Sequence, residues 1–352
     1  MNRDLVVVLL VIAVFTVAMW TVYGVPVLQF LINGVVVGSI IVLGATGLSL
    51  IYGIRKFGNF AHGEMMTFGA YMAFLISVSF AMNIIWGLIF GVFMAAMLGI
   101  LFELLVFRKL AGRGPVAALV ASIGIAIFMN NLINATFGTQ INVYNLQIAQ
   151  SLVLLTIDGR PVLTINPIKG LATLAVSAVL IIFLHVVLSR TTLGKAMRAT
   201  SDNPDLARAS GINIRNVILW VWAISGGLAA VAGVLLGIVN DVRPAMGFSI
   251  LLFVFAAVII GGIGSPYGAM VGGFLIGIVE KLSSVFFGQL TSMGIVENGA
   301  SYGPAGAFVV MVLVLLIKPE GLMGRRRPSE GRRRRGALFA RRIPKEVADV
   351  GD

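Results

Sequence analysis

Uncharged apolar runs long enough to cross a lipid bilayer are the feature that most constrains this chain. Residues 5–23 contain 19 consecutive uncharged positions, and about 20 residues of helix span the hydrocarbon of a bilayer. Further runs cover residues 27–53, 60–82, 84–107, 115–137, 168–189, 217–239, 249–262, 268–287 and 304–317. Only 11% of the residues are charged, against about 25% in a soluble protein. The chain is therefore predicted to be an all-α polytopic integral membrane protein.

The number of spans depends on the run 249–262, which is too short for a straight span. It continues through the glycine-rich residues 261–266 into the next run, so the pair forms either two spans or two half-helices that re-enter the membrane. The sequence thus predicts about eight to ten transmembrane helices with glycine-rich broken or re-entrant segments. The run 5–23 follows a single arginine and precedes no clear small-residue cleavage site, which favours an uncleaved anchor.

Lysine and arginine predict the orientation of the chain. With the N-terminus inside, 22 of the 26 basic residues fall on the cytoplasmic side. The basic residues left outside are Arg160, Lys169, Arg243 and Lys281. Both termini and residues 190–216 then lie in the cytoplasm. Residues 138–167 lie outside, where loose alternation over 141–165 and a turn at Asp158-Gly159 predict a small β-hairpin.

The net charge of +12 is local, because nine arginines lie between residues 325 and 342. We expect this tail, residues 325–352, to anchor on anionic lipid rather than to bind nucleic acid. Residues 1–324 are predicted to form a single transmembrane domain. The chain has no cysteine and two histidines, which excludes disulfides and thiolate ligands and leaves no cluster for metal binding or nucleophilic catalysis. An enzyme is therefore not expected.

Residues 44–74, GATGLSLIYGIRKFGNFAHGEMMTFGAYMAF, join two apolar runs through a short polar loop. Lipid offers no hydrogen-bond partner, so broken backbone at membrane depth persists only where protein or a water-filled cavity covers it. Residues 257–278, AVIIGGIGSPYGAMVGGFLIGI, repeat this layout weakly. The candidates for lining a solute path are Asn59, His62, Glu64, Gly261, Gly264 and Pro266.

His62 and Glu64 are the only histidine and acid near this loop. Two residues spaced i and i+2 point apart on a helix, so they are not expected to share a metal ion. The helix dipole favours an acid in the first turn, which makes interfacial capping the simpler interpretation of Glu64. The alternative is a role in lining or gating the path, since ionisable residues within membrane segments are often functional.

Residues 190–216, RTTLGKAMRATSDNPDLARASGINIRN, are the longest polar insertion between spans. Asp202 or Asn203 can cap a helix, Pro204 and Asp205 suit its first turn, and Gly211 can end it. These signals predict a short helix over residues 204–210 on the cytoplasmic face. A plain connector or a helix lying on the lipid surface are the alternatives.

Two stretches together resemble the H-type permease subunit of branched-chain amino acid ABC transporters. They are GLSLIYGIRKFGNFAHGEMMTFGAYMAF and RTTLGKAMRATSDNPDLARASGINIRNVI, the second being similar to the cytoplasmic coupling loop of that family. The stretches FAAVIIGGIGSPYGAMVGGFLIGIVE and IKPEGLMG also match the C-terminal pattern of the family. The resemblance covers about residues 34–324 and does not include the basic tail. It implies that the residues coupling the chain to an ATPase are Gly194, Pro204, Asp205, Leu206, Ala207 and Gly211.

The resemblance implies an importer in the cytoplasmic (inner) membrane of a prokaryote, carrying leucine, isoleucine or valine. Its expected partners are a second, M-type permease, two cytoplasmic ATPases and an extracytoplasmic substrate-binding protein. No cofactor is expected in this chain, because Gly194-Lys195-Ala196 lacks the hydroxyl residue and the upstream loop of a phosphate-binding motif. The alternatives are a permease for urea, short amides or other amino acids, and a secondary transporter driven by an ion gradient.

Overall fold

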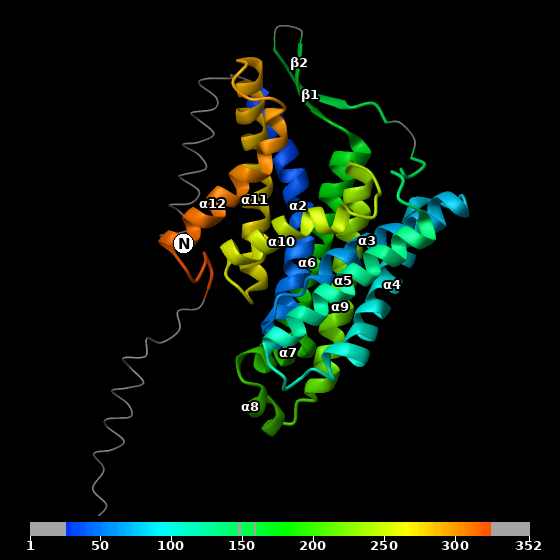
Figure 1. The fold of residues 1–352 in the computed structure, drawn as a ribbon, viewed down its shortest axis with the longest axis vertical. Helices are drawn as coiled ribbons and strands as arrows, with labels where there is room; N and C mark the ends of the chain where they lie inside the picture. Colours follow the sequence, from blue (N-terminus) through cyan, green and yellow to red (C-terminus); the bar gives the residue numbers. More distant parts are fainter. Residues whose placement is uncertain (1–25, 147–148, 158–159, 325–352) are drawn as a thin grey trace, which may run out of the picture.

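The computed structural model describes residues 26–146, 149–157 and 160–324 (Figure 1). The anchor predicted for residues 5–23, the hairpin turn at residues 158–159 and the basic tail, residues 325–352, lie outside the described residues. The predictions made for these segments therefore stay predictions.

The described chain is almost entirely helical, with a single two-stranded sheet. Its elements are α2 (Pro26–Arg55), α3 (Ala61–Phe74), η1 (Leu75–Ser79), α4 (Ile84–Phe102), η2 (Glu103–Phe107), α5 (Pro115–Phe137), β1 (Leu152–Ile157), β2 (Arg160–Ile165), η3 (Pro167–Ala172), α6 (Thr173–Arg190), α7 (Thr192–Asp202), α8 (Pro204–Ala209), α9 (Ile214–Val239), α10 (Met246–Gly261), α11 (Pro266–Ser292), η4 (Gly299–Tyr302) and α12 (Gly303–Ile317). Each of the nine apolar runs that falls within the described residues coincides with a helix. Seven of these helical segments are long and apolar enough to cross a membrane. The prediction of an all-α polytopic membrane protein is confirmed.

Helix α3 occupies the centre of the bundle and packs against α2, α4, α5, α9 and α10. Glycines make this packing close. A Cβ atom added to Gly63 would lie 2.6 Å from the Gly247 carbonyl oxygen, and one added to Gly233 on α9 would collide with the Met66 backbone. These contacts place 11 of the 14 residues of α3 in the interior.

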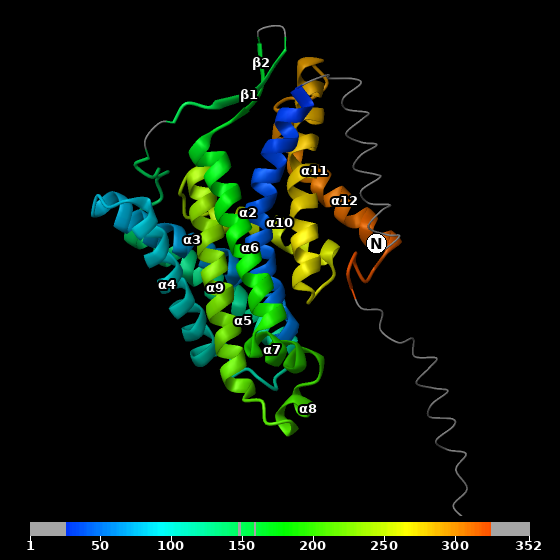
Figure 2. The same cartoon turned by 180° about the vertical axis from the view of Figure 1, so that it is seen from behind.

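Helices α2 and α11 lie side by side and antiparallel in both ribbon views (Figures 1 and 2). Gly34 and Gly38 of α2 face Gly277 and Gly273 of α11, so the two backbones approach closely. Helix α11 has 27 residues, whereas α10 has 16. Helix α11 is thus long enough for a full span, and within this pair α10 is the short helix.

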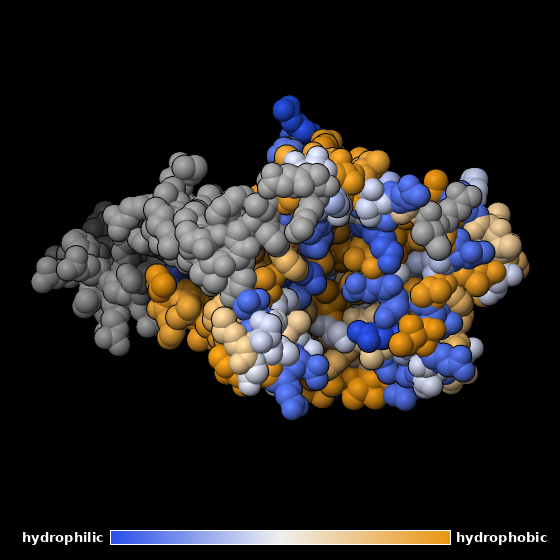
Figure 3. All heavy atoms as spheres, turned by 90° about the horizontal axis from the view of Figure 1, so that it is seen from above, coloured by the Kyte–Doolittle hydropathy of each residue, from blue (hydrophilic) through white to orange (hydrophobic). Residues whose placement is uncertain are grey.

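Large apolar side chains cover the outer faces of α4, α5, α6 and α12, for example Phe93, Phe128, Val179 and Leu316. In Figure 3, which looks onto the end that carries the hairpin, hydrophilic residues gather over the middle of the face and hydrophobic ones emerge around the edge. This distribution is the one expected when lipid surrounds the bundle.

The two ends of the bundle differ. One end carries β1 and β2, which pair antiparallel as predicted, and the other carries α7 and α8 (Figure 1). At the hairpin end, Asn142 and Val242 form an isolated bridge, and the buried Tyr144 hydroxyl donates a hydrogen bond to the Ala70 carbonyl oxygen at 2.9 Å. Burial raises the pKa of Tyr144, so its hydroxyl remains a donor. The basic segments around Lys56 and residues 190–216 share the opposite end.

Candidate functional site: a pocket where two chain breaks meet

We use the term chain break for a short non-helical join between two helices. The first chain break, residues 56–60, joins α2 to α3, and its residues Phe57 and Asn59 are buried. Lys56 has a left-handed backbone conformation, with φ of 58°, which reverses the chain. The Oδ1 atom of the fully buried Asn59 accepts a hydrogen bond from the Ala61 backbone N–H at 3.1 Å and so satisfies an open donor at the start of α3. The Asn59 Nδ2 atom has no hydrogen-bond partner among the described residues.

His62 and Glu64 in the first turn of α3 are both buried and face different neighbours. The His62 Nε2 atom lies 2.9 Å from the Gly44 carbonyl oxygen of α2. The Glu64 carboxyl group lies beside the side chains of Asn130 on α5 and Thr67. The two side chains do not converge, as their spacing predicted, and the described part of the chain holds no group of three side chains suited to bind a metal ion.

The second chain break, residues 262–265, joins α10 to α11. Gly262 and Gly264 have φ values of 103° and 83°, a region that side-chain-bearing residues rarely adopt. The Ser265 Oγ atom accepts a hydrogen bond from the Gly268 N–H at 3.1 Å, and Pro266 occupies the first turn of α11. Residues of the segment itself therefore both end α10 and start α11.

The C-terminal end of α10 is completed by a distant segment. The backbone N–H groups of Leu322 and Met323 donate hydrogen bonds to the carbonyl oxygens of Ile260 and Gly261 at 2.7 and 2.9 Å. These carbonyls belong to the last turn of α10 and have no partner further along the helix. The segment after α12 thus acts as a backbone cap for α10.

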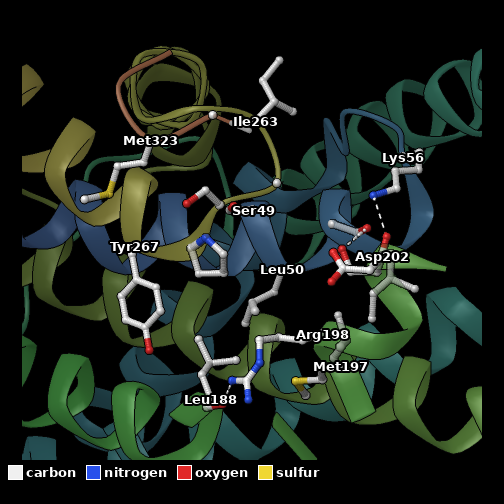
Figure 4. A pocket seen from close by; sticks show the side chains of 18 residues that line it. Ser49, Leu50, Lys56, Leu188, Met197, Arg198, Asp202, Ile263, Tyr267 and Met323 are labelled. Carbon is white, nitrogen blue, oxygen red and sulfur yellow. Dashed lines mark hydrogen bonds between the residues drawn. The ribbon is translucent and has the colours of Figure 1, made fainter. Parts of the chain in front are cut away.

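The two breaks meet at the α7–α8 end of the bundle, where Gly264 lies against Gly53 of α2. A cavity of about 510 Å³ opens there between α2, α6, α7, both breaks and the segment after α12, and we call it the junction pocket. Its size is in the range of sites for small solutes. Figure 4 shows Tyr267 on one side of the pocket and Lys56 and Asp202 on the other.

Polar groups in the junction pocket belong mainly to α7 and hold it against α2 and α6. The Ser201 hydroxyl donates to the Gly53 carbonyl oxygen at 2.8 Å, and the Lys56 ammonium group donates to the Ser201 carbonyl oxygen at 3.3 Å. The Arg198 guanidinium donates to the Leu188 carbonyl oxygen. Apolar side chains complete the wall (Figure 4), so the pocket combines charged groups of both signs with apolar surface.

The structure places the six predicted path residues in two regions. Gly264 and Pro266 line the junction pocket, and Gly261 ends the helix directly before it. The predicted path residues of the first break and α3, Asn59, His62 and Glu64, lie in the protein interior, and none of them lines this pocket. Their role in transport stays a prediction.

Helix α8 forms where the sequence predicted it. The Asn203 Oδ1 atom accepts hydrogen bonds from the N–H groups of Asp205 and Leu206, both at 3.1 Å, and Pro204 opens the first turn. Gly211, with φ of 81°, ends the segment. The choice left open between Asp202 and Asn203 as the capping residue is settled in favour of Asn203.

The predicted coupling residues are not equally accessible. Leu206 is 64% exposed, whereas Ala207 is buried and Gly194 packs directly against the backbone of α6 at Val187 and Leu188. Only Leu206 therefore offers a large apolar side chain to another protein from α8. Gly194 and Ala207 hold the segment to its own chain.

The sequence reasoning missed three features of the site. Helix α7 was expected to be loop, although Gly194, Met197 and Thr200 recur at a spacing of three and form its buried face. Tyr267 and Met323 of the junction pocket carried no local signal. Tyr267 also contacts His185 of α6, with 3.1 Å between its hydroxyl and the His185 Nδ1 atom.

Comparison with known proteins agrees with this architecture. The family model described as branched-chain amino acid transport system / permease component matches residues 30–317. The high-affinity branched-chain amino acid transport system permease protein LivH of Salmonella typhimurium is 32% identical over 309 residues, which cover 85% of this chain and 96% of the relative. The corresponding protein BraD of Pseudomonas aeruginosa is 32% identical over 314 residues, with the same coverage.

Among solved structures, PsaBC from Streptococcus pneumoniae in complex with Fab aligns at 16% identity over 87% of this chain and 96% of that chain, with a TM-score of 0.46. This likeness is too distant to carry an assignment. The sequence matches extend from α2 through α12 and include both chain breaks and the α7–α8 segment. The chain therefore belongs to the family of permease components of branched-chain amino acid transport systems.

Proposed function

We propose that this chain is a permease subunit of an ATP-driven importer that moves leucine, isoleucine or valine across the cytoplasmic membrane. The junction pocket carries the proposal, because it is a solute-sized cavity enclosed by both chain breaks and by α7. A solute path that ends beside α7 and α8 can respond to a partner that moves these helices. The LivH and BraD relatives, which are named for branched-chain amino acid transport, support the class of solute.

The partners proposed for the chain are a second, M-type permease, two cytoplasmic ATPases and an extracytoplasmic binding protein. The exposed Leu206 of α8 supports contact with an ATPase, since a few apolar anchors dominate most interfaces. We further propose that anionic lipid binds the basic tail. The cytoplasmic side is assigned to the α7–α8 end, because 22 of the 26 basic residues then face the cytoplasm.

A different solute is the second candidate. The fructose import permease protein FrcC of Rhizobium meliloti is 32% identical over 110 residues, which cover 29% of this chain. Such a partial match shows similarity to a permease named for a sugar. Leucine uptake is expected to be reduced by unlabelled isoleucine and valine and left unchanged by fructose, urea or short amides.

The decisive experiment reconstitutes the chain with its partner subunits and measures uptake of labelled leucine. We expect uptake that depends on ATP and on the binding protein. The chain alone should neither bind nor hydrolyse ATP. Stoichiometric ATP binding at micromolar affinity by the isolated chain, or leucine uptake driven by an ion gradient without ATPase subunits, would contradict the proposal.

The orientation is tested by single cysteines, which the cysteine-free chain makes unambiguous. Cysteines at Arg198 and Arg333 should react with an impermeant reagent from the cytoplasmic side, and one at Asp158 from the outside. Labelling of position 158 from the cytoplasmic side alone would reverse the assigned orientation.

A further inference from the structure

A second pocket at the α7–α8 end has four arginines in its lining, and we call it the arginine pocket. It has a volume of about 360 Å³ and lies between the ends of α2, η2 and α8 and the start of α9. Its charged lining residues are Arg55, Glu103, Arg108, Arg208 and Arg215. Four cations and one carboxylate give this lining a formal charge of +3. Such a concentration of positive charge favours an anion.

Among the described residues, the positive charge of the arginine pocket is only partly neutralised. Arg55 donates to both carboxyl oxygens of the buried Glu103, which forms a bidentate pair. Arg208 and Asp205 form an ion pair at 3.5 Å in which both side chains are exposed to solvent. Such exposed pairs contribute little stability. The structure describes no side-chain hydrogen bond or ion pair for Arg108 and Arg215.

The rest of the pocket lining is mainly apolar, with Asn213 as its one uncharged polar residue. Ile212, Ile218 and Leu219 form the apolar wall. Two large exposed apolar side chains adjoin lining residues in sequence. Trp220 of α9 follows Leu219 and is 57% exposed, and Leu105 of η2 lies two positions after Glu103 and is 55% exposed. Tryptophan is enriched at the membrane–water interface, so this edge of the pocket lies at the level of lipid headgroups.

We propose that the arginine pocket binds the phosphate group of an anionic phospholipid, with the acyl chains lying along Leu105 and Trp220. Basic pockets between transmembrane helices bind the headgroups of anionic lipids by this combination of charge and adjacent apolar surface. A soluble phosphate ion has the same charged group as the lipid headgroup, but it has no apolar part that could contact the apolar wall. The inference does not depend on which solute the transporter carries.

The bound lipid would tie α8 to the body of the bundle. Helix α8 packs mainly against α7, with a smaller contact to α9. Arg208 belongs to α8, whereas Arg108 follows η2 and Arg215 belongs to α9. A single phosphate held by these three side chains bridges three segments. The lipid therefore sets the position of the helix on which Leu206 is displayed.

The test measures lipid retained by the assembled transporter, using native mass spectrometry after exchange into bilayers of phosphatidylcholine and phosphatidylglycerol. Wild type is expected to retain phosphatidylglycerol. The double variant R108Q/R215Q should bind it about 30-fold more weakly, since each arginine near an anionic headgroup contributes about a factor of five. The variant R108K/R215K keeps both charges and should retain most of the binding.

The matched control is K109Q/R113Q, which removes two exposed charges from the same connection outside the pocket. It should bind phosphatidylglycerol as wild type does. Equal binding by R108Q/R215Q and wild type would overturn the proposal, as would an equal loss in the control, which would indicate diffuse attraction to the surface. Should R108Q/R215Q fail to assemble, R215Q alone decides, with an expected fivefold loss and unchanged binding as the contrary result.

A second arm of the experiment separates lipid from soluble phosphate. Inorganic phosphate at millimolar concentration should leave retained phosphatidylglycerol in place. Displacement by inorganic phosphate would assign the pocket to a soluble anion and overturn the choice of lipid. Because lipid retention is measured without transport, failure of this proposal and failure of the proposed importer function give different results.

Discussion

Helix α3 and helix α8 are held in place in opposite ways. Helix α3 buries 11 of its 14 residues and is positioned by contacts with five other helices. Helix α8 exposes five of its six residues and is defined by its own Asn203 cap and by Gly211. Long-range packing thus fixes the first, and local hydrogen bonds fix the second. Changes in α3 should therefore prevent folding, whereas changes on the exposed side of α8 should alter function in a folded protein.

The substitution Gly63→Val should have the largest effect and tests the first half of this contrast. The added Cβ would lie 2.6 Å from the Gly247 carbonyl oxygen, so two helix backbones must separate. Overpacking of this kind costs about 1–3 kcal/mol and more where backbone blocks relaxation. We expect loss of folded permease from the membrane, measured by abundance and by size-exclusion chromatography in detergent.

The matched control is Gly124→Val on α5, where no atom lies within 4 Å of the added Cβ. It should leave abundance unchanged. Normal recovery of Gly63→Val would mean that α3 is not rigidly positioned by its neighbours.

The substitution Leu206→Asp should abolish transport while leaving the permease folded. If Leu206 inserts into an ATPase, the introduced carboxylate enters a desolvated site at a cost of several kcal/mol. Uptake of labelled leucine should fall to background and the ATPase should no longer co-purify, with membrane abundance preserved. Lys195→Ala, exposed and outside α8, should keep near-normal uptake. Retention of both uptake and ATPase recovery by Leu206→Asp would make α8 a connector only.

The smallest effect is expected for Ser201→Ala in the junction pocket. This change removes the 2.8 Å hydrogen bond to the Gly53 carbonyl oxygen and loosens α7 from α2 at a cost of about 1 kcal/mol. Leucine uptake should fall severalfold with abundance unchanged. Ser210→Ala, whose hydroxyl bonds within the α8 turn, is the control and should differ little from wild type. Equal uptake in both variants would show that the Ser201 contact does not matter for transport.

The same contrast between local and long-range contacts explains which parts of the molecule could be predicted from the sequence. Apolar runs gave the bounds of α5, residues 115–137, without error, because lipid demands a helix wherever such a run crosses it. The cap and proline of α8 were equally readable, since all the partners lie within a few residues. Helix α7 was missed, although its buried face recurs at helical spacing, because its mean composition is polar.

The junction pocket was beyond prediction from one sequence. It joins Ser201, Tyr267 and Met323, which are separated by 56 or more positions in the chain and become neighbours only through packing. Local patterns located both chain breaks and their weak similarity. They contained no information that Gly264 lies against Gly53, or that His62 and Glu64 do not line the pocket.

The cap that Leu322 and Met323 place on α10 has a consequence for biosynthesis. Helix α10 ends at Gly261, so more than sixty further residues must be made before its last carbonyl oxygens find their donors. During translation, the α10–α11 corner therefore stays incomplete while α11 and α12 are inserted. A chain that stalls before residue 322 lacks the donors for the Ile260 and Gly261 carbonyl oxygens at this corner. The wall of the junction pocket closes only when nearly the whole permease domain has been synthesised.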